Sequence, residues 1–69
     1  MGTGEVKPNG RAVRRRETRE RVYTAAVTEF RRVGMAAADV SVITGEAGVA
    51  RGTFYFHFPT KEHVLAELE

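Results

Sequence analysis

The chain has 69 residues, of which 42% are hydrophobic and 29% charged, and it contains no cysteine. This length allows one domain with a modest core and no deep substrate pocket, and neither disulfides nor thiolate zinc sites can support it. No segment approaches a membrane span or has the pattern of a secretory signal, so we expect a cytoplasmic protein with no membrane partner.

The net charge of +2 conceals an asymmetry along the chain. Residues 1–32 carry nine Lys or Arg and four Glu, whereas residues 33–69 carry two Lys or Arg against five Asp or Glu. A basic leading half suggests a polyanionic partner such as nucleic acid, although basic runs are often no more than solvated surface.

Residues 1–16 are predicted to form a basic, disordered arm, followed by a folded domain over residues 17–69. The first ten residues include three glycines, a proline and an Asn-Gly pair, which leave little apolar surface to bury. The arm then merges into a helix through an arginine-dense run, which supplies three candidate DNA contacts: Arg14, Arg15 and Arg16.

The first helix is predicted from a stripe of apolar residues at helical spacing, formed by Val22, Ala26, Phe30 and Val33. Most of the polar residues between them, including Glu29, are expected to point away from the core. Gly34 follows the stripe and is expected to end the helix in a left-handed conformation.

A second, short helix is predicted to begin at Asp39, whose carboxylate suits the N-cap position. Val40, Ile43 and Ala47 would face the first helix, since they lie three and four residues apart. Gly48 is expected to end this helix and open a tight turn.

A third helix is predicted over residues 51–57, because Pro59 prevents its continuation. A fourth helix is expected after Thr60, with an apolar face of Val64, Leu65 and Leu68. The chain stops within this pattern and shows no stop signal, so we expect it to be one piece of a larger protein.

Two helices joined by a short glycine-containing turn are typical of a helix-turn-helix, and the third helix would be its recognition helix. Phe54 and Phe58 lie four residues apart and are expected to anchor it in the core. The N-terminal residues of a recognition helix meet base edges, and Arg51 is the long donor there that can read guanine. The sequence thus predicts an all-α, three-helix helix-turn-helix domain plus the start of a fourth, linking helix.

Other side chains near the recognition helix have more than one interpretation. Phe56 is suited equally to core and surface, and His57 equally to a phosphate contact and to a structural hydrogen bond. His57, Glu62 and His63 do not share one helix face with i, i+4 spacing, so no metal site is expected. With no cysteine and one serine, Ser41, no catalytic set is visible, and neither an enzyme nor a cofactor is expected.

From about Arg19 to Leu68 the sequence resembles the N-terminal DNA-binding domain of TetR-family transcriptional regulators. The resemblance is carried in register by Ala25, Ala26, Phe30, Gly34, Val40, Ile43, Ala47, Gly48, Val49, Gly52, Thr53, Phe54, Tyr55, His57, Phe58, Lys61 and Glu62. It implies a homodimeric, ligand-responsive regulator, most often a repressor. A C-terminal domain outside this chain would dimerise and bind a small-molecule effector, and the dimer would bind a palindromic operator in double-stranded DNA.

The resemblance also implies roles for individual residues. Positions matching Arg51, Gly52, Thr53 and Tyr55 face the major groove, whereas those matching Phe56, His57 and Lys61 meet the DNA backbone, as do residues around Ser41. The sequence departs from the family pattern at several positions, and at Ala38, Asp39, Ala50 and Phe56 the departure removes a hydroxyl group. We therefore expect the arginines of the arm to supply part of the affinity. The alternative is a basic helical protein-interaction module without specific DNA readout.

Overall fold

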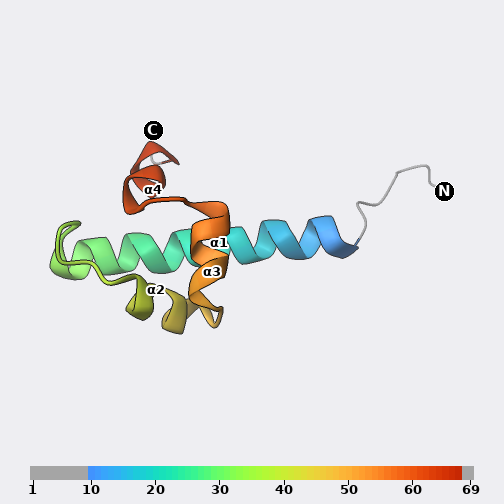
Figure 1. Ribbon diagram of the computed structural model, residues 1–69, viewed down its shortest axis with the longest axis horizontal. Helices are drawn as coiled ribbons and strands as arrows, with labels where there is room; N and C mark the ends of the chain where they lie inside the picture. The colour runs from blue at the N-terminus through green and yellow to red at the C-terminus, as the bar shows by residue number, and fades with distance from the viewer. Residues whose placement is uncertain (1–9, 68–69) are drawn as a thin grey trace.

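The computed structural model describes residues 10–67, which form four helices: α1 (Gly10–Val33), α2 (Val40–Ala47), α3 (Arg51–His57) and α4 (Lys61–Glu67). No strand occurs in this range, and the predicted all-α fold is confirmed. Helix α1 runs along the length of the molecule, with α2 on one side, α4 on the other and α3 crossing its middle (Figure 1). Its N-terminal turns project beyond the other helices (Figure 1).

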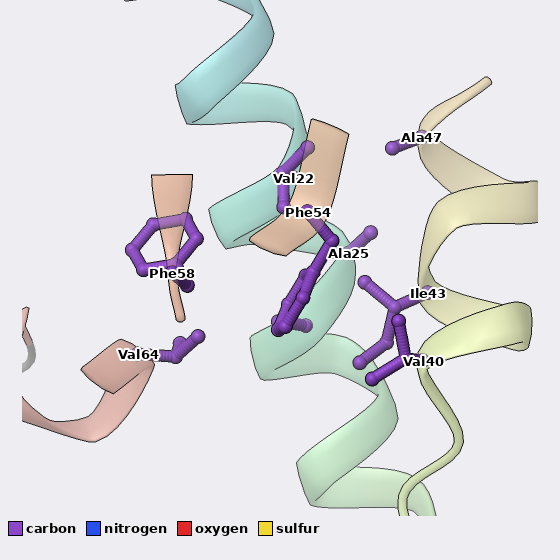
Figure 2. Packing of buried hydrophobic residues seen from close by; sticks show 9 residues of the cluster. Val22, Ala25, Val40, Ile43, Ala47, Phe54, Phe58 and Val64 are labelled. Carbon is purple, nitrogen blue, oxygen red and sulfur yellow. The ribbon is translucent and has the colours of Figure 1, made fainter. Parts of the chain in front are cut away.

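The core lies where the three short helices meet α1, and all four helices contribute to it (Figure 2). Phe54 and Phe58 are fully buried, as predicted, with ring centroids 5.9 Å apart. Since aromatic rings bury the largest apolar surfaces, these two residues are the main attachment of α3 to the core. The other core residues are Val22, Ala25, Ala26, Val40, Ile43, Ala47 and Val64.

The predicted apolar stripe of α1 is longer than the surface that covers it. Val22 and Ala26 are fully buried, whereas Phe30 is half-buried and Val33 is exposed. Leu65 on α4 is also exposed, although the sequence placed it on the apolar face. The covering helices have only seven or eight residues each, too few to reach the end of α1. Leu68 lies outside the described residues.

The predicted helix ends are confirmed in detail. Gly34 and Gly48 adopt positive φ angles of 84° and 75°, in the left-handed region that glycine tolerates without strain. Asp39 caps α2, because its Oδ1 accepts a hydrogen bond of 2.8 Å from the backbone N–H of Ser41.

The start of α1 differs from the expected arm. Residues 10–16 are helical and continuous with the rest of α1, while residues 1–9 lie outside the described range. Arginine, alanine and glutamate are good helix formers, and Arg16–Glu20 and Glu17–Arg21 have the i, i+4 spacing that favours a helix. Helical propensity therefore extends α1 beyond its buried turns. None of the described helices is long and apolar enough to span a membrane.

Candidate nucleic-acid interface

The turn between α2 and α3 sets the position of the predicted recognition helix. The backbone N–H groups of Gly48 and Val49 both donate to the carbonyl of Thr44, at 2.8 and 3.0 Å. Val49 packs against the core from within the turn. The Thr44 hydroxyl is buried and donates to the carbonyl of Val40 at 3.0 Å. The turn is thus held to the end of α2 by backbone hydrogen bonds and to the core by the side chain of Val49.

Helix α3 buries Phe54 and turns an uncharged aromatic surface outward beside one cation. Phe56 is 70% exposed and Tyr55 is 43% exposed, so both of these rings lie on the surface. Arg51 and Gly52 are exposed at the start of the helix, and Thr53 is half-buried. Arg51 forms no ion pair with any residue between 10 and 67, so its guanidinium is available to a partner.

Ser41 lies on the first turn of α2, where it is exposed. Its backbone N–H is taken by the Asp39 cap, while its hydroxyl has no hydrogen-bond partner in the described part of the chain. The Asp39 carboxylate stands beside it and would repel a phosphate approaching this turn. Ser41 is therefore a weaker candidate contact than the residues of α3.

The projecting turns of α1 carry the candidate arginines on more than one face. Arg14, Arg15 and Arg16 are all exposed, but successive residues of a helix are turned by about 100°. Arg15 instead lies in a row with Arg11 and Arg19, each four residues from the next. This spacing in the sequence could have identified Arg11 and Arg19, which the residue-by-residue prediction omitted.

The row leads to His57 at the end of α3. Burial lowers the pKa of His57 below its usual 6.5, and the positive charges of Arg19 and Arg15 lower it further. The guanidinium carbon of Arg19 lies 4.9 Å from the centroid of the Phe58 ring, next to His57 in the chain. Arg19 also forms an ion pair of 2.8 Å with Glu67 on α4. Arg19 of α1 therefore lies beside the end of α3, where the charges of Arg19 and Arg15 act on His57.

Lys61 and Glu29 bind the two ends of a single peptide group before α2. The Lys61 ammonium donates to the carbonyls of Met35 and Ala38, at 3.0 and 2.9 Å. The backbone N–H of Asp39, in the same peptide group as the Ala38 carbonyl, donates to Glu29 Oε2 at 3.3 Å. The ammonium predicted to meet a phosphate is thus already engaged by the loop between α1 and α2.

The prediction that Glu29 points away from the core is wrong. Glu29 is only 4% exposed, and its Oε1 accepts hydrogen bonds of 3.1 and 2.8 Å from the guanidinium of Arg32. A buried carboxylate needs such partners to offset its lost hydration. Glu29 lies seven residues after Val22 and so shares its face of α1, which is the signal that could have revealed its burial.

The opposite flank of the molecule has the other charge sign. An open groove between α1 and α2 is lined by three glutamates, Glu17, Glu20 and Glu46, together with Arg21. Arg21 Nε donates to the carbonyl of Ala47 at 3.3 Å, which ties α1 to the end of α2. This flank would repel a polyanion, so the nucleic-acid candidates lie with α3 and the Arg15 row.

The histidines show no arrangement for metal binding. His63 Nδ1 lies 2.8 Å from the hydroxyl of Thr60, which occupies one ring nitrogen. Within residues 10–67 no group of three His, Cys, Asp or Glu side chains is placed to hold a metal ion.

Comparison with known proteins gives a consistent result. Residues 22–68 match the model of the family described as bacterial regulatory proteins, tetR family. The chain is 37% identical over 49 residues to an uncharacterized HTH-type transcriptional regulator, YerO, of Bacillus subtilis (strain 168). The aligned segment is 71% of this chain and 17% of that protein. It is 43% identical over 49 residues to the HTH-type transcriptional regulator SrpR of Pseudomonas putida, covering 71% of this chain and 23% of that protein.

A third relative is an uncharacterized HTH-type transcriptional regulator, YdgC, also of Bacillus subtilis (strain 168). It is 42% identical over 52 residues, which are 75% of this chain and 27% of that protein. The chain thus spans less than a third of the length of each of these three relatives. No solved structure gave a significant match.

Proposed function

Because the chain belongs to the tetR family of bacterial regulatory proteins, as its helix-turn-helix DNA-binding domain, we propose that it reads a specific operator in double-stranded DNA. Helix α3 enters the major groove, where Arg51 binds a guanine and Thr53 and Tyr55 contact neighbouring bases. Gly52 allows the backbone to approach closely. The family consists of regulators, which agrees with the prediction that the chain is not an enzyme.

The observation that carries this proposal is the exposed face of α3. Arg51, Tyr55 and Phe56 are exposed on a helix that the buried Phe54 fixes to the core. Arg51 is exposed and has no ion-pair partner within residues 10–67, so its donors are available for bidentate readout. Exposed aromatic rings can pack on thymine methyl groups and on the sugar backbone.

Backbone contacts complete the proposed interface. The resemblance assigns them to Phe56, His57, Lys61 and Ser41, and the charge of α1 adds Arg14, Arg15 and Arg16. Phe56 lacks a hydroxyl and would contribute apolar contact alone, and two of the three N–H donors of Lys61 are engaged by carbonyls. The α1 arginines therefore carry the larger share of phosphate binding in this proposal.

The complete regulator, in this proposal, is a cytoplasmic homodimer that represses transcription and responds to a small-molecule effector. A domain beyond α4 would supply dimerisation and effector binding. The support is family membership and the short share of each relative that the chain spans. Two domains related by a two-fold axis would require a palindromic operator.

Selection of bound duplexes from a random pool tests the proposal, followed by affinity measurements on the enriched sequence. Arg51→Ala should cost about 1–3 kcal/mol, concentrated at one base pair of the site. Phe30→Leu, distant from α3 in the sequence and half-buried on α1, serves as a control expected to keep the selected sequence unchanged. Enrichment of no sequence would contradict operator reading and favour the protein-interaction alternative.

A further inference from the structure

Helix α2 is attached to α1 at both of its ends by charged side chains of α1. At the end of α2, Arg21 Nε donates to the carbonyl of Ala47 at 3.3 Å. At its start, the backbone N–H of Asp39 donates to Glu29 Oε2, also at 3.3 Å. The eight residues from Arg21 to Glu29 span about 12 Å of α1, and α2 itself has eight residues. The two contacts therefore match the length of α2, which runs antiparallel to α1 (Figure 2).

The signs of the two charges suit the dipole of α2. Anions are stabilising near the start of a helix and cations near its end, where backbone N–H groups and carbonyls lack partners within the helix. Glu29 brings a carboxylate to the start of α2, and Arg21 brings a guanidinium to its end. The other carboxylate oxygen of Glu29 is held by the guanidinium of Arg32, at 3.1 and 2.8 Å, which fixes the orientation of the carboxylate.

Arg21 donates to a backbone carbonyl although three carboxylates lie nearby. Glu17, Glu20 and Glu46 line the same groove between α1 and α2, but within residues 10–67 none of them forms an ion pair with Arg21. Exposed ion pairs contribute little to stability, whereas the last carbonyls of a helix have no partner within it. The guanidinium thus supplies a donor to a carbonyl that α2 itself cannot satisfy.

The apolar contacts between α1 and α2 leave the position of α2 along α1 weakly determined. The hydrophobic effect is non-directional, and α2 contributes Val40, Ile43 and Ala47 to the core. Hydrogen bonds weaken steeply with distance and angle, so contacts at both ends of α2 oppose a shift in either direction. Burial thus holds α2 on α1, and the two charged side chains specify where it lies.

The position of α2 also determines that of the turn before α3. The carbonyl bound by Arg21 and the N–H of Gly48 belong to one planar peptide group, and this N–H donates to the carbonyl of Thr44 at 2.8 Å. The N–H of Val49 donates to the same carbonyl at 3.0 Å. The first peptide group of the turn is therefore held from α1, and α3 begins at Arg51, directly after this turn.

We propose that Arg21 and Glu29 are positioning residues, which set where the helix-turn-helix lies along α1 and thereby increase the preference for the operator over other DNA. The inference rests on the proposed function, in which bases are read from α3 and phosphates are bound largely from α1. Base contacts require one placement of α3, whereas phosphate contacts carry no sequence information. A shift of α2 and α3 along α1 therefore weakens operator binding more than binding to random DNA.

NMR of the 69-residue chain tests the positioning directly. NOEs between α1 and α2 measure where α2 lies, and residual dipolar couplings measure the angle between the two helices. Arg21→Met removes every donor of this side chain and should alter both. Arg21→Lys, whose ammonium can donate to the same carbonyl, should restore them. Arg31→Met, at an exposed arginine of the same helix, should change neither. An unaltered position and angle in Arg21→Met would overturn the proposal.

DNA binding tests the consequence. The measured quantity is the ratio of the affinity for the duplex enriched by selection to the affinity for a random duplex. Arg21→Met should lower this ratio by at least about fivefold, the lower end of what one bidentate base contact contributes, and Arg31→Met should leave it unchanged. Equal losses on both duplexes, with a salt slope lower by about one unit, would make Arg21 a phosphate contact and overturn the proposal.

Glu29 is tested by a separate pair of variants. Glu29→Gln replaces one carboxylate oxygen by a donor and removes the charge, so it should also lower the ratio. Glu20→Gln, the same change at an exposed position of α1, should not. An unchanged ratio in Glu29→Gln would overturn the role of Glu29. If selection enriches no duplex, the proposed function fails; if a duplex is enriched and Arg21→Met discriminates as well as the wild type, only this inference fails.

Discussion

The two halves of α1 are built on the same backbone geometry but are held by different forces. Every buried residue of this helix lies in residues 22–33, which we call the packed half. Residues 10–21, the basic half, contain no buried residue and five arginines besides Arg21: Arg11, Arg14, Arg15, Arg16 and Arg19. The packed half therefore contributes to the stability of the domain and the basic half contributes positive charge, so the charge can be changed by substitutions that leave the stability unaltered.

This separation has a physical origin. An isolated helix of about twelve residues is marginal in water, and tertiary packing provides most helical stability in proteins. The basic half is stabilised by continuity with the packed half and by two tethers from its last turns, namely Arg19 to Glu67 and Arg21 to the carbonyl of Ala47. Within residues 10–67, neither tether reaches its first turns, which carry Arg11, Arg14 and Arg15.

The largest expected effect is a loss of stability on removing the aromatic ring of Phe54, which packs in the core against the packed half of α1. Phe54→Ala should destabilise the domain by about 3–5 kcal/mol, which is much of the stability available to so small a protein. Thermal unfolding followed by circular dichroism measures the loss. Phe56→Ala provides a matched control on the same helix, because this exposed ring should change stability by no more than about 0.5 kcal/mol. Equal losses would contradict the assignment of these two faces of α3.

Glu29 tests whether polar contacts of the packed half also matter to folding. Glu29→Ala removes the acceptor of the Asp39 N–H and of Arg32, so it should cost about 1–3 kcal/mol. Urea unfolding of this variant is best compared with Glu20→Ala, the same change at an exposed position of the basic half. A Glu20 variant as unstable as the Glu29 variant would show that burial does not distinguish the two halves.

Lys61 distinguishes a structural cation from a DNA-binding one. Lys61→Ala breaks two hydrogen bonds to carbonyls and should lower the free energy of unfolding by about 1 kcal/mol. We expect the slope of log affinity against log salt to fall by well under one unit, because carbonyls engage two of the three Lys61 donors and a full phosphate contact contributes about one unit. A slope reduced by one unit would instead assign Lys61 to the DNA backbone.

The basic half should give the reverse pattern. Replacing Arg14, Arg15 and Arg16 together with Gln should reduce the salt slope by up to about three units, while stability changes by no more than about 0.5 kcal/mol. The same replacement at Arg31, an exposed arginine of the last turn, is the control. An unaltered slope after the triple change would leave the basic half without a role in DNA binding.

The smallest expected effect is on the stability of the free protein at mildly acidic pH. Burial first, and then Arg19 and Arg15, lower the pKa of His57 in the folded state. The folded protein therefore binds fewer protons there than the unfolded chain. The resulting stability is present above about pH 6.5, the unfolded value, and is lost as pH falls through the folded pKa.

Melting temperatures measured between pH 7.5 and 5 check this sign. The wild type should lose more stability over this interval than His57→Gln, whereas His63→Gln should behave as the wild type. A His57 variant that loses as much as the wild type would contradict the shift.

The parts of the fold that local patterns determine were predictable. Apolar spacing and Pro59 located the four helices apart from the first turns of α1, and residue type located the left-handed glycines at 34 and 48 and the cap at Asp39. The burial of Phe54 and Phe58 followed from their spacing together with the proline after them. In each case the controlling interaction acts within a few residues.

Interactions between distant residues were not predictable in the same way. Lys61 reaches carbonyls 23 and 26 residues away, and Glu29 reaches the backbone of a residue ten positions later. The start of α1 also lies before the predicted domain boundary at residue 17, because the arginine-dense run assigned to the arm is helical from Gly10. The candidate DNA contacts stay predictions, although the exposure of Arg51, Tyr55 and Phe56 is compatible with them.

The peptide group between Ala38 and Asp39 has a mechanical consequence. Its carbonyl is held from α4 by Lys61 and its N–H from α1 by Glu29, so three helices converge on one rigid plane. A displacement of α4 would pull directly on the peptide group that precedes α2, as well as on the core through Val64. Lys61 thus adds a hydrogen-bonded link from α4 to the start of the helix-turn-helix, beside the chain connection through Pro59 and the core contact of Val64.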